Sequence, residues 1–218
     1  MDNLNNTLTT HTETTYNLLD IIAKGGILMI PLAFLFILAV YIFFNRYFLI
    51  NKQIKKSNQV VNNAINYLKA NQIEEIPKLC NDYNNLIAKV IYKIVLNLGK
   101  PMNQIHTLSE DTARIEVSKL EKNISILSLI AAIAPMVGFV GTVMGIIEIF
   151  FNIAQIGEIS INVIAGGLYV KLITSAAGLI IGIIAYIFYY ILDNKLDSIA
   201  IYIEEKSSKI LEVLENPN

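Results

Sequence analysis

Two charged side chains stand in or beside the apolar stretches of this 218-residue chain, where charge needs an explanation. Lys171 lies within the apolar stretch 159–192, and Glu148 closes the charge-free run 124–147. A lysine near the bilayer centre costs about 2.5–3.5 kcal/mol on insertion scales, so it usually faces protein or water. Two interpretations stay open. Lys171 either reaches the interface or pairs structurally with Glu148, or it sets the potential inside a pore and holds a partner's carboxylate.

Small and polar residues recur at three- and four-residue steps in the same two stretches, which places them on one side of each helix. In the first stretch they are Ser125, Ser128, Ala132, Pro135, Gly138, Thr142 and Gly145. In the second they are Gly167, Lys171, Thr174, Ser175, Gly178 and Gly182. Small residues let helix backbones approach in lipid, so one interpretation is helix packing. Two matching stripes with hydroxyls at mid-depth favour a polar pathway.

Other chemistry has little support in the sequence. The net charge is −1, which gives no basic patch for nucleic acid. His11 and His106 lack the neighbours that a metal or catalytic site requires. We find no nucleophile–base pair, phosphate loop or metal cluster, and therefore expect no catalytic residue, no metal and no cofactor. The chain is not expected to be an enzyme.

Three membrane-spanning helices are predicted, because 54% of the residues are hydrophobic and they gather in three long runs. The segment between the first two runs holds most of the chain's 17 Lys and Arg, and the loop between the last two holds none. The positive-inside rule then places the N-terminus outside and both the middle segment and the C-terminus in the cytoplasm. The first 26 residues are polar and slightly acidic, unlike the start of a signal peptide.

The predicted organisation is all-α and integral to the membrane, with long cytoplasmic helices. It comprises a periplasmic tail with a short interfacial helix (1–26), three transmembrane helices (27–44, 124–150 and 161–192), a cytoplasmic helical domain (45–123), a short periplasmic loop (151–160) and a cytoplasmic C-terminal helix (193–218). Within the cytoplasmic domain, the apolar periodicity predicts one helix from the first span to Ile76, broken by Pro77. A second is expected to reach about Leu98, and a third to run on into the second span.

The run from Ile133 to Gly145 reads I-A-P-M-V-G-F-V-G-T-V-M-G. It resembles the second-span signature of the ExbB/TolQ/MotA proton-channel family, and the ExbB-like members most closely. The entrance to the first span, Lys24 to Pro31, and the third span, Gly166 to Gly178, are also similar to that family. The resemblance covers residues from about 15 to 192.

The resemblance implies a homopentamer around a central pore in the bacterial inner membrane. In this family the pore holds the single spans of an ExbD-like partner dimer, whose aspartate carries the proton. Ion flow then energises a TonB-like protein. Thr142 matches the family's pore threonine, and Ser175 matches the threonine of the third span. We therefore expect Pro135, Gly138, Thr142, Thr174 and Ser175 to line the pore.

This chain departs from the family at one position that matters. Many members have a glutamate in the third span where this chain has Val170, and Lys171 follows it. The proton-carrying acid would then come from the partner. Two other functions stay open: a membrane scaffold that conducts no ions, and an ion-driven stator for motility. The four spans of MotA-type members argue against the stator.

Overall fold

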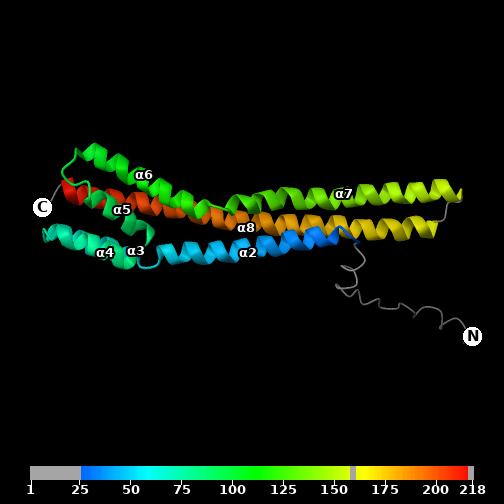
Figure 1. Ribbon diagram of the computed structural model, residues 1–218, viewed down its shortest axis with the longest axis horizontal. Coiled ribbons are helices and arrows are strands. Elements are labelled where there is room, and N and C mark those ends of the chain that lie inside the picture. The colour runs from blue at the N-terminus through cyan, green and yellow to red at the C-terminus, as the bar shows by residue number, and fades with distance from the viewer. Residues whose placement is uncertain (1–25, 158–160, 216–218) are drawn as a thin grey trace, which may run out of the picture. The chain divides into compact units, whose positions relative to one another are not determined.

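The computed structural model describes residues 26–157 and 161–215, which are almost entirely helical and contain no strand (Figure 1). The predicted interfacial helix and nearly all of the 1–26 tail lie outside these residues. The elements in chain order are α2 (Met29–Ile54), α3 (Ser57–Lys69), η1 (Ile73–Glu75), α4 (Ile76–Tyr83), α5 (Leu86–Val95), α6 (Met102–Glu121), α7 (Ile124–Ile156) and α8 (Ile161–Glu215).

Three helices in the described part of the chain, α2, α7 and α8, are long and apolar enough to cross a membrane. A helix suits that setting because it satisfies its own backbone hydrogen bonds where no water is present. This confirms the predicted all-α membrane class. The helices extend past the predicted spans, since α7 continues to Ile156 and α8 is unbroken over 55 residues.

The chain forms two compact units. The hairpin unit contains, among the described residues, 26–34, 134–157 and 161–181, so it holds the facing parts of α7 and α8 and the start of α2. The bundle unit contains 35–133 and 182–215, with α3 to α6 and the second part of α8. The residues that could form an ion pathway belong to the hairpin unit.

The helices of the bundle unit are shorter than the sequence predicts. Instead of one helix to Ile76, the chain breaks after α2 and again after α3, with Lys56 at φ 65° and Asn71 at φ 55°. Pro77 lies in the first turn of α4, where its missing N–H costs nothing, so it starts a helix rather than ending one.

The other two predicted bundle helices are also interrupted. Asn84 (φ 41°) separates α4 from α5, and Asn123 (φ 71°) separates α6 from α7. Asparagine is one of the few residues that enters the left-handed region readily, because its short amide can hydrogen-bond locally. Asn85 then caps α5, its side-chain oxygen accepting from the Ala88 N–H at 3.0 Å.

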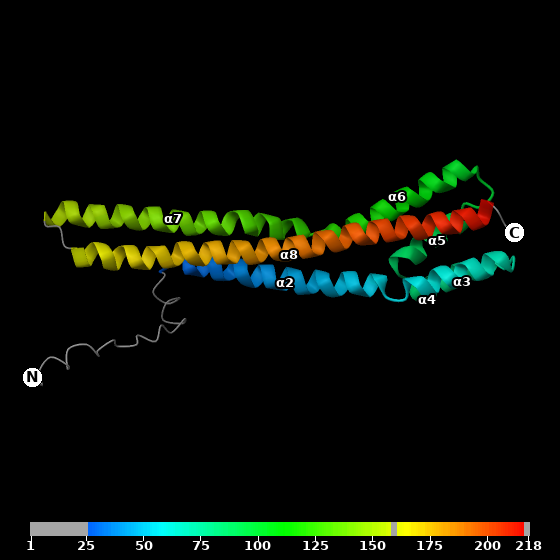
Figure 2. The ribbon, with the colours of Figure 1, turned by 180° about the vertical axis from the view of Figure 1, so that it is seen from behind.

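Apolar contacts hold the bundle unit together, with α3, α4 and α5 close to one another (Figure 2). Ile76, Ile87, Ile91 and Ile94 are almost fully buried, as are Leu196, Ile203 and Ile210 of α8. Polar and aromatic contacts fix α8 further. The Tyr202 hydroxyl lies 2.6 Å from Asn58 Oδ1, and the Phe43 and Phe188 rings stack with centroids 4.1 Å apart.

Glu116 of α6 is a buried carboxylate held by two lysines. Lys89 Nζ donates to it at 2.8 Å, and Lys119 Nζ also donates. Burial is the largest single influence on its pKa and raises it. The two lysines outweigh burial, so the pKa of Glu116 lies below its ordinary value of 4.5. A carboxyl group with a lowered pKa stabilises the fold above its unfolded pKa, and the contribution is lost as pH falls through the folded value.

Replacing Glu116 by glutamine is therefore expected to lower the free energy of unfolding at pH 7 by about 1.5–3 kcal/mol, the range for hydrogen bonds to charged groups. The deficit relative to the unmodified chain should shrink as pH falls below 4.5. Thermal unfolding of the purified full-length chain across this pH range measures it. A deficit that stays constant with pH would contradict the assignment.

Candidate functional site

The α7 and α8 helices of the hairpin unit lie side by side (Figures 1 and 2). Their backbones come close together at two glycines. A Cβ placed on Gly178 would lie 2.5 Å from the Ala134 carbonyl oxygen and 3.1 Å from Gly138 Cα. A Cβ on Gly138 would lie 3.1 Å from the backbone of Ser175. Both contacts are with backbone, so neither position has room for a side chain. The two glycines set the distance between the helices.

Thr142 follows on the same side of α7 and links the two helices through its hydroxyl. Its Oγ1 donates to the Lys171 carbonyl oxygen at 3.2 Å and lies 3.4 Å from the Gly138 carbonyl, one turn back in its own helix. The side chain is half-buried. A hydroxyl has one proton and two lone pairs, so the oxygen can still accept a hydrogen bond from water or an acid.

The other residues expected to line a pore have different surroundings. Thr174 is 1% exposed, and a Cβ on Gly141 would meet its methyl group at 3.2 Å, so it fills the contact between the helices. Gly138 is buried in the same contact. Ser175 and Pro135, like Thr142, are half-buried. Of the three hydroxyl side chains, those of Thr142 and Ser175 therefore reach the surface of the unit.

Lys171 lies across α7 at Gly145, the last glycine of the motif. A Cβ on Gly145 would overlap the Cγ, Cδ and Cε atoms of Lys171, so the missing side chain makes the space for the lysine. The Lys171 Nζ lies 3.4 Å from Glu148 Oε2, with the side chains 28% and 66% exposed. One of the two sequence interpretations, an ion pair with Glu148, is present.

Lys171 and Glu148 are the sole Asp, Glu, Lys or Arg residues in the described part of the hairpin unit. Val170, at the position of the family's acid, is half-buried and cannot titrate. Among the described residues of the whole chain, no group of His, Cys, Asp and Glu could hold a metal ion. The hairpin therefore offers hydroxyl oxygens and one ion pair.

Gly145→Ala and Glu148→Gln are expected to have effects on thermal stability that do not add, because either change alone breaks the ion pair with Lys171. The clash at position 145 is with a flexible side chain, so the alanine variant should keep the fold. The contact is partly exposed, and we expect a coupling of about 0.2–1 kcal/mol. A double-mutant cycle on the purified chain measures it. Strict additivity would show that the pair does not form.

Spacing alone did not reveal what each glycine of the motif does. Gly138 and Gly178 bring backbones together, and Gly145 admits a lysine side chain. A Cβ on Gly141 would lie 2.9 Å from Cδ1 of Leu28, in the turn before α2. One signal in the sequence could have suggested that Gly145 makes room for a side chain. It is the presence of a lysine, Lys171, in the neighbouring span.

Comparison with known proteins shows which family this chain resembles. Residues 82–205, which include most of α7 and α8, match the MotA/TolQ/ExbB proton channel family. The chain belongs to this family. A biopolymer transport protein of Synechocystis sp., ExbB-like 1, is 31% identical over 187 residues, which cover 82% of this chain and 71% of the relative.

Two further members of the MotA/TolQ/ExbB family are similar over shorter regions. An ExbB-like 1 protein of Helicobacter pylori is 40% identical over 79 residues, which cover 36% of this chain and 42% of the relative. The biopolymer transport protein exbB1 of Vibrio cholerae is 37% identical over 99 residues, or 43% of each chain. These two alignments span less than half of either protein. Together with the family match, the three relatives confirm the predicted resemblance to ExbB-like members.

Proposed function

We propose that this chain is the proton-channel subunit of an ExbB–ExbD-like motor in the bacterial inner membrane, with its N-terminus in the periplasm and its C-terminus in the cytoplasm. Five copies surround a central pore that holds a dimer of single-span, ExbD-like partners. The motor uses the proton motive force to energise a TonB-like protein for transport across the outer membrane.

One observation carries the proposal. In a member of a proton channel family, glycine contacts hold α7 and α8 together and leave the Thr142 and Ser175 side chains half-exposed on the hairpin. Hydroxyls on two adjacent spans can line a wet path if the exposed side of each copy faces a common axis. Polar side chains within a membrane usually face the interior of a bundle or a cavity.

The chemistry requires a second chain. No carboxylate stands at Val170, and the one carboxylate in the described part of the hairpin unit, Glu148, is paired with Lys171, so we expect the group that takes up and releases the proton to come from the partner's span. The Thr142 oxygen, whose own proton is donated to the Lys171 carbonyl, can accept a hydrogen bond from a protonated acid. Moving one proton through about 150 mV releases roughly 3.5 kcal/mol. That energy is available to move the partner against the hairpins.

Proton flux into lipid vesicles tests the proposal. The chain would be purified with an ExbD-like single-span partner, reconstituted, and subjected to a membrane potential while a pH-sensitive dye reports the interior. Vesicles with both proteins are expected to conduct protons, and vesicles in which the partner's membrane aspartate is changed to asparagine are not.

The same experiment separates the alternatives. A complex that assembles but conducts no ions at any potential would support the scaffold and contradict the channel. Flux that persists without the partner's carboxyl group would show that the acid is elsewhere. A stator for motility would conduct too, and growth that depends on outer-membrane uptake distinguishes it from a transport motor.

A further inference from the structure

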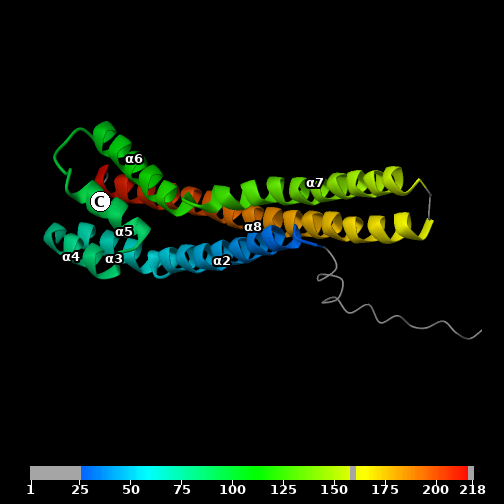
Figure 3. The same cartoon turned by 45° about the vertical axis from the view of Figure 1, so that its right-hand side comes forward.

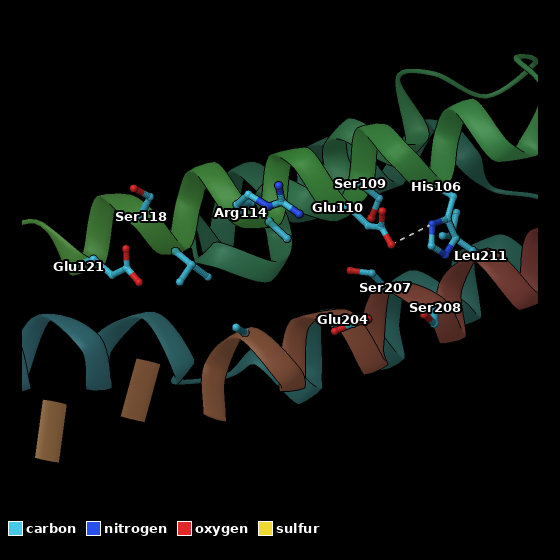
Figure 4. Close-up of a pocket in the computed structure, with 13 residues that line it drawn as sticks. His106, Ser109, Glu110, Arg114, Ser118, Glu121, Glu204, Ser207, Ser208 and Leu211 are labelled. Carbon is cyan, nitrogen blue, oxygen red and sulfur yellow. Dashed lines mark ion pairs between the residues drawn. The ribbon is translucent and has the colours of Figure 1, made fainter. Parts of the chain in front are cut away.

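The α6 helix and the second part of α8 lie side by side in the bundle unit (Figure 3). A groove runs between them (Figure 4). Its volume is about 440 Å³. Small residues form much of its lining, among them Ser109 and Ala113 of α6 and Ala200 of α8. Such residues leave the space between the helices open along several turns. The groove is therefore long enough to receive part of another protein segment.

The groove is acidic. Glu110 and Glu121 line it from α6 and Glu204 from α8, against one arginine, Arg114. His106 Nδ1 lies 3.3 Å from Glu110 Oε1, the ion pair drawn in Figure 4. All three carboxylates belong to exposed residues. An occupant with positive charge would match this lining.

A buried hydroxyl in the same groove has no partner. Ser207 is 6% exposed, and its Oγ makes no hydrogen bond within the described residues. Figure 4 shows it on α8, facing Ser109 and Glu110 of α6 across the groove. Buried polar atoms are almost always hydrogen-bonded in native proteins. Together with the acidic lining, this orphaned group indicates that the groove is occupied in the assembled protein.

A basic and apolar surface on the same unit has the complementary character. It consists of Tyr92, Lys93 and Leu96 at the end of α5 and Lys100 in the turn that follows, and is called the basic knob below. Leu96 is 59% exposed although its neighbours Ile94 and Val95 are buried. Exposed apolar residues beside cations are typical of contact surfaces. Because the knob is exposed within one chain, it does not fill that chain's own groove.

We propose that the basic knob of one copy docks into the acidic groove of the next copy. This inference rests on the proposed function, in which several copies form a ring. It names the surfaces through which neighbouring copies contact each other outside the membrane spans. A contact between two different surfaces is heterologous, and such contacts generate closed rings when the rotation closes. Lys93 and Lys100 face the carboxylates, and Leu96 covers the small residues near Ser207.

Paired cysteines test the contact in the full complex. Cys80 is 5% exposed with a pKa raised to about 11 by burial, and it is replaced by alanine so that no other thiol remains. Leu96→Cys and Ser208→Cys are then introduced together, since Ser208 lines the groove and is exposed. A short bis-maleimide is expected to link the copies into a ladder that ends at the size of the ring.

Each single-cysteine variant is the matched control. A head-to-tail contact leaves both singles monomeric after treatment, whereas dimers from Ser208→Cys alone would mean that the groove faces itself. Absence of a ladder in a complex whose mass still equals the ring overturns the contact. Linkage of Ser208→Cys to the single-span partner, carrying its own cysteine, would also overturn it, because the partner would then occupy the groove.

Charge reversal supplies a second test. Lys93→Glu or Glu204→Lys alone is expected to reduce the ladder about tenfold, which corresponds to the lower end of coupling energies for close charge pairs across an interface. Both changes together should restore it, and restoration shows that neither variant is misfolded. Glu205→Lys, an exposed neighbour that does not line the groove, is the control and should leave the ladder unchanged.

Proton flux is measured separately on the same preparations. A ladder without flux would refute the channel and keep the contact. Flux without a ladder would keep the channel and refute the contact. Failure of the double reversal to recover the ladder, with each single still assembling a ring of the right mass, would show that these two charges do not meet.

Discussion

Replacing Gly178 by alanine is expected to destabilise the hairpin unit by about 1–3 kcal/mol, the range for inserting carbon atoms where no space exists. The new Cβ would lie 2.5 Å from the Ala134 carbonyl oxygen. That oxygen belongs to the backbone of α7 and cannot rotate away, so the two helices must separate. Unfolding of the purified chain by denaturing detergent, followed by circular dichroism, measures the change.

Gly166→Ala is the matched control on the same helix, because a Cβ there meets nothing within 4 Å. Alanine is favoured over glycine in a helix by about 0.8–1.0 kcal/mol, so this variant should be neutral or slightly more stable. The comparison removes the effect of helix propensity. Equal stability of the two variants would show that α7 and α8 do not approach at Gly178.

Replacing Thr142 by alanine is expected to reduce proton flux by roughly twofold to tenfold while the complex still assembles. In the proposed channel the hydroxyl oxygen accepts a hydrogen bond from the protonated, neutral acid, and a net hydrogen bond between neutral groups is worth about 0.5–1.5 kcal/mol. If this hydrogen bond stabilises the transition state for proton transfer and not the ground state, its loss lowers the rate by a factor in this range. Vesicle flux measures it, with the mass of the purified complex as the assembly check.

Two further changes at this position separate the hydroxyl from the shape of the side chain. Thr142→Ser keeps the oxygen that donates to Lys171 and should conduct nearly normally. Thr142→Val keeps the shape without the hydroxyl and should match alanine. Normal flux in the valine variant would remove Thr142 from the ion path and leave it as a contact between α7 and α8.

The sequence predicted the three membrane helices well, because long charge-free runs have few alternatives in a folded protein. It predicted the helix ends in the bundle unit poorly. In the part of the chain that the structure describes, four non-glycine residues have positive φ: the asparagines Asn71, Asn84 and Asn123, and Lys56. The sequence prediction took glycine and proline as the residues that end helices, and so it missed these four. Asparagine ends helices through the same left-handed backbone, and only tertiary packing decides which asparagine does so.

The candidate site divides in the same way. The motif could be recognised from glycine, proline and threonine spacing, and the stripe correctly indicated close packing of two spans. Spacing could not tell which small residue meets a backbone and which meets a side chain. That distinction depends on the register of α7 against α8, which places Gly145 opposite Lys171 and Gly138 opposite Ser175.

The same register connects structure with the proposed function. Gly138 and Gly178 remove the space between the helices, so lipid and water are excluded from the contact itself. Thr174 and Gly138 are buried in the contact between the helices, and Thr142 and Ser175 lie half-buried at its edge. Hydroxyls at the edge of this contact stand where the proposed partner could reach them.

Imaging the complex, purified in lipid with an ExbD-like single-span partner, tests this arrangement most directly. The account predicts that the Thr142 and Ser175 side chains of every copy face one central cavity that contains the partner's helices. A map in which these side chains face lipid acyl chains, with no cavity at the centre of the assembly, would contradict it.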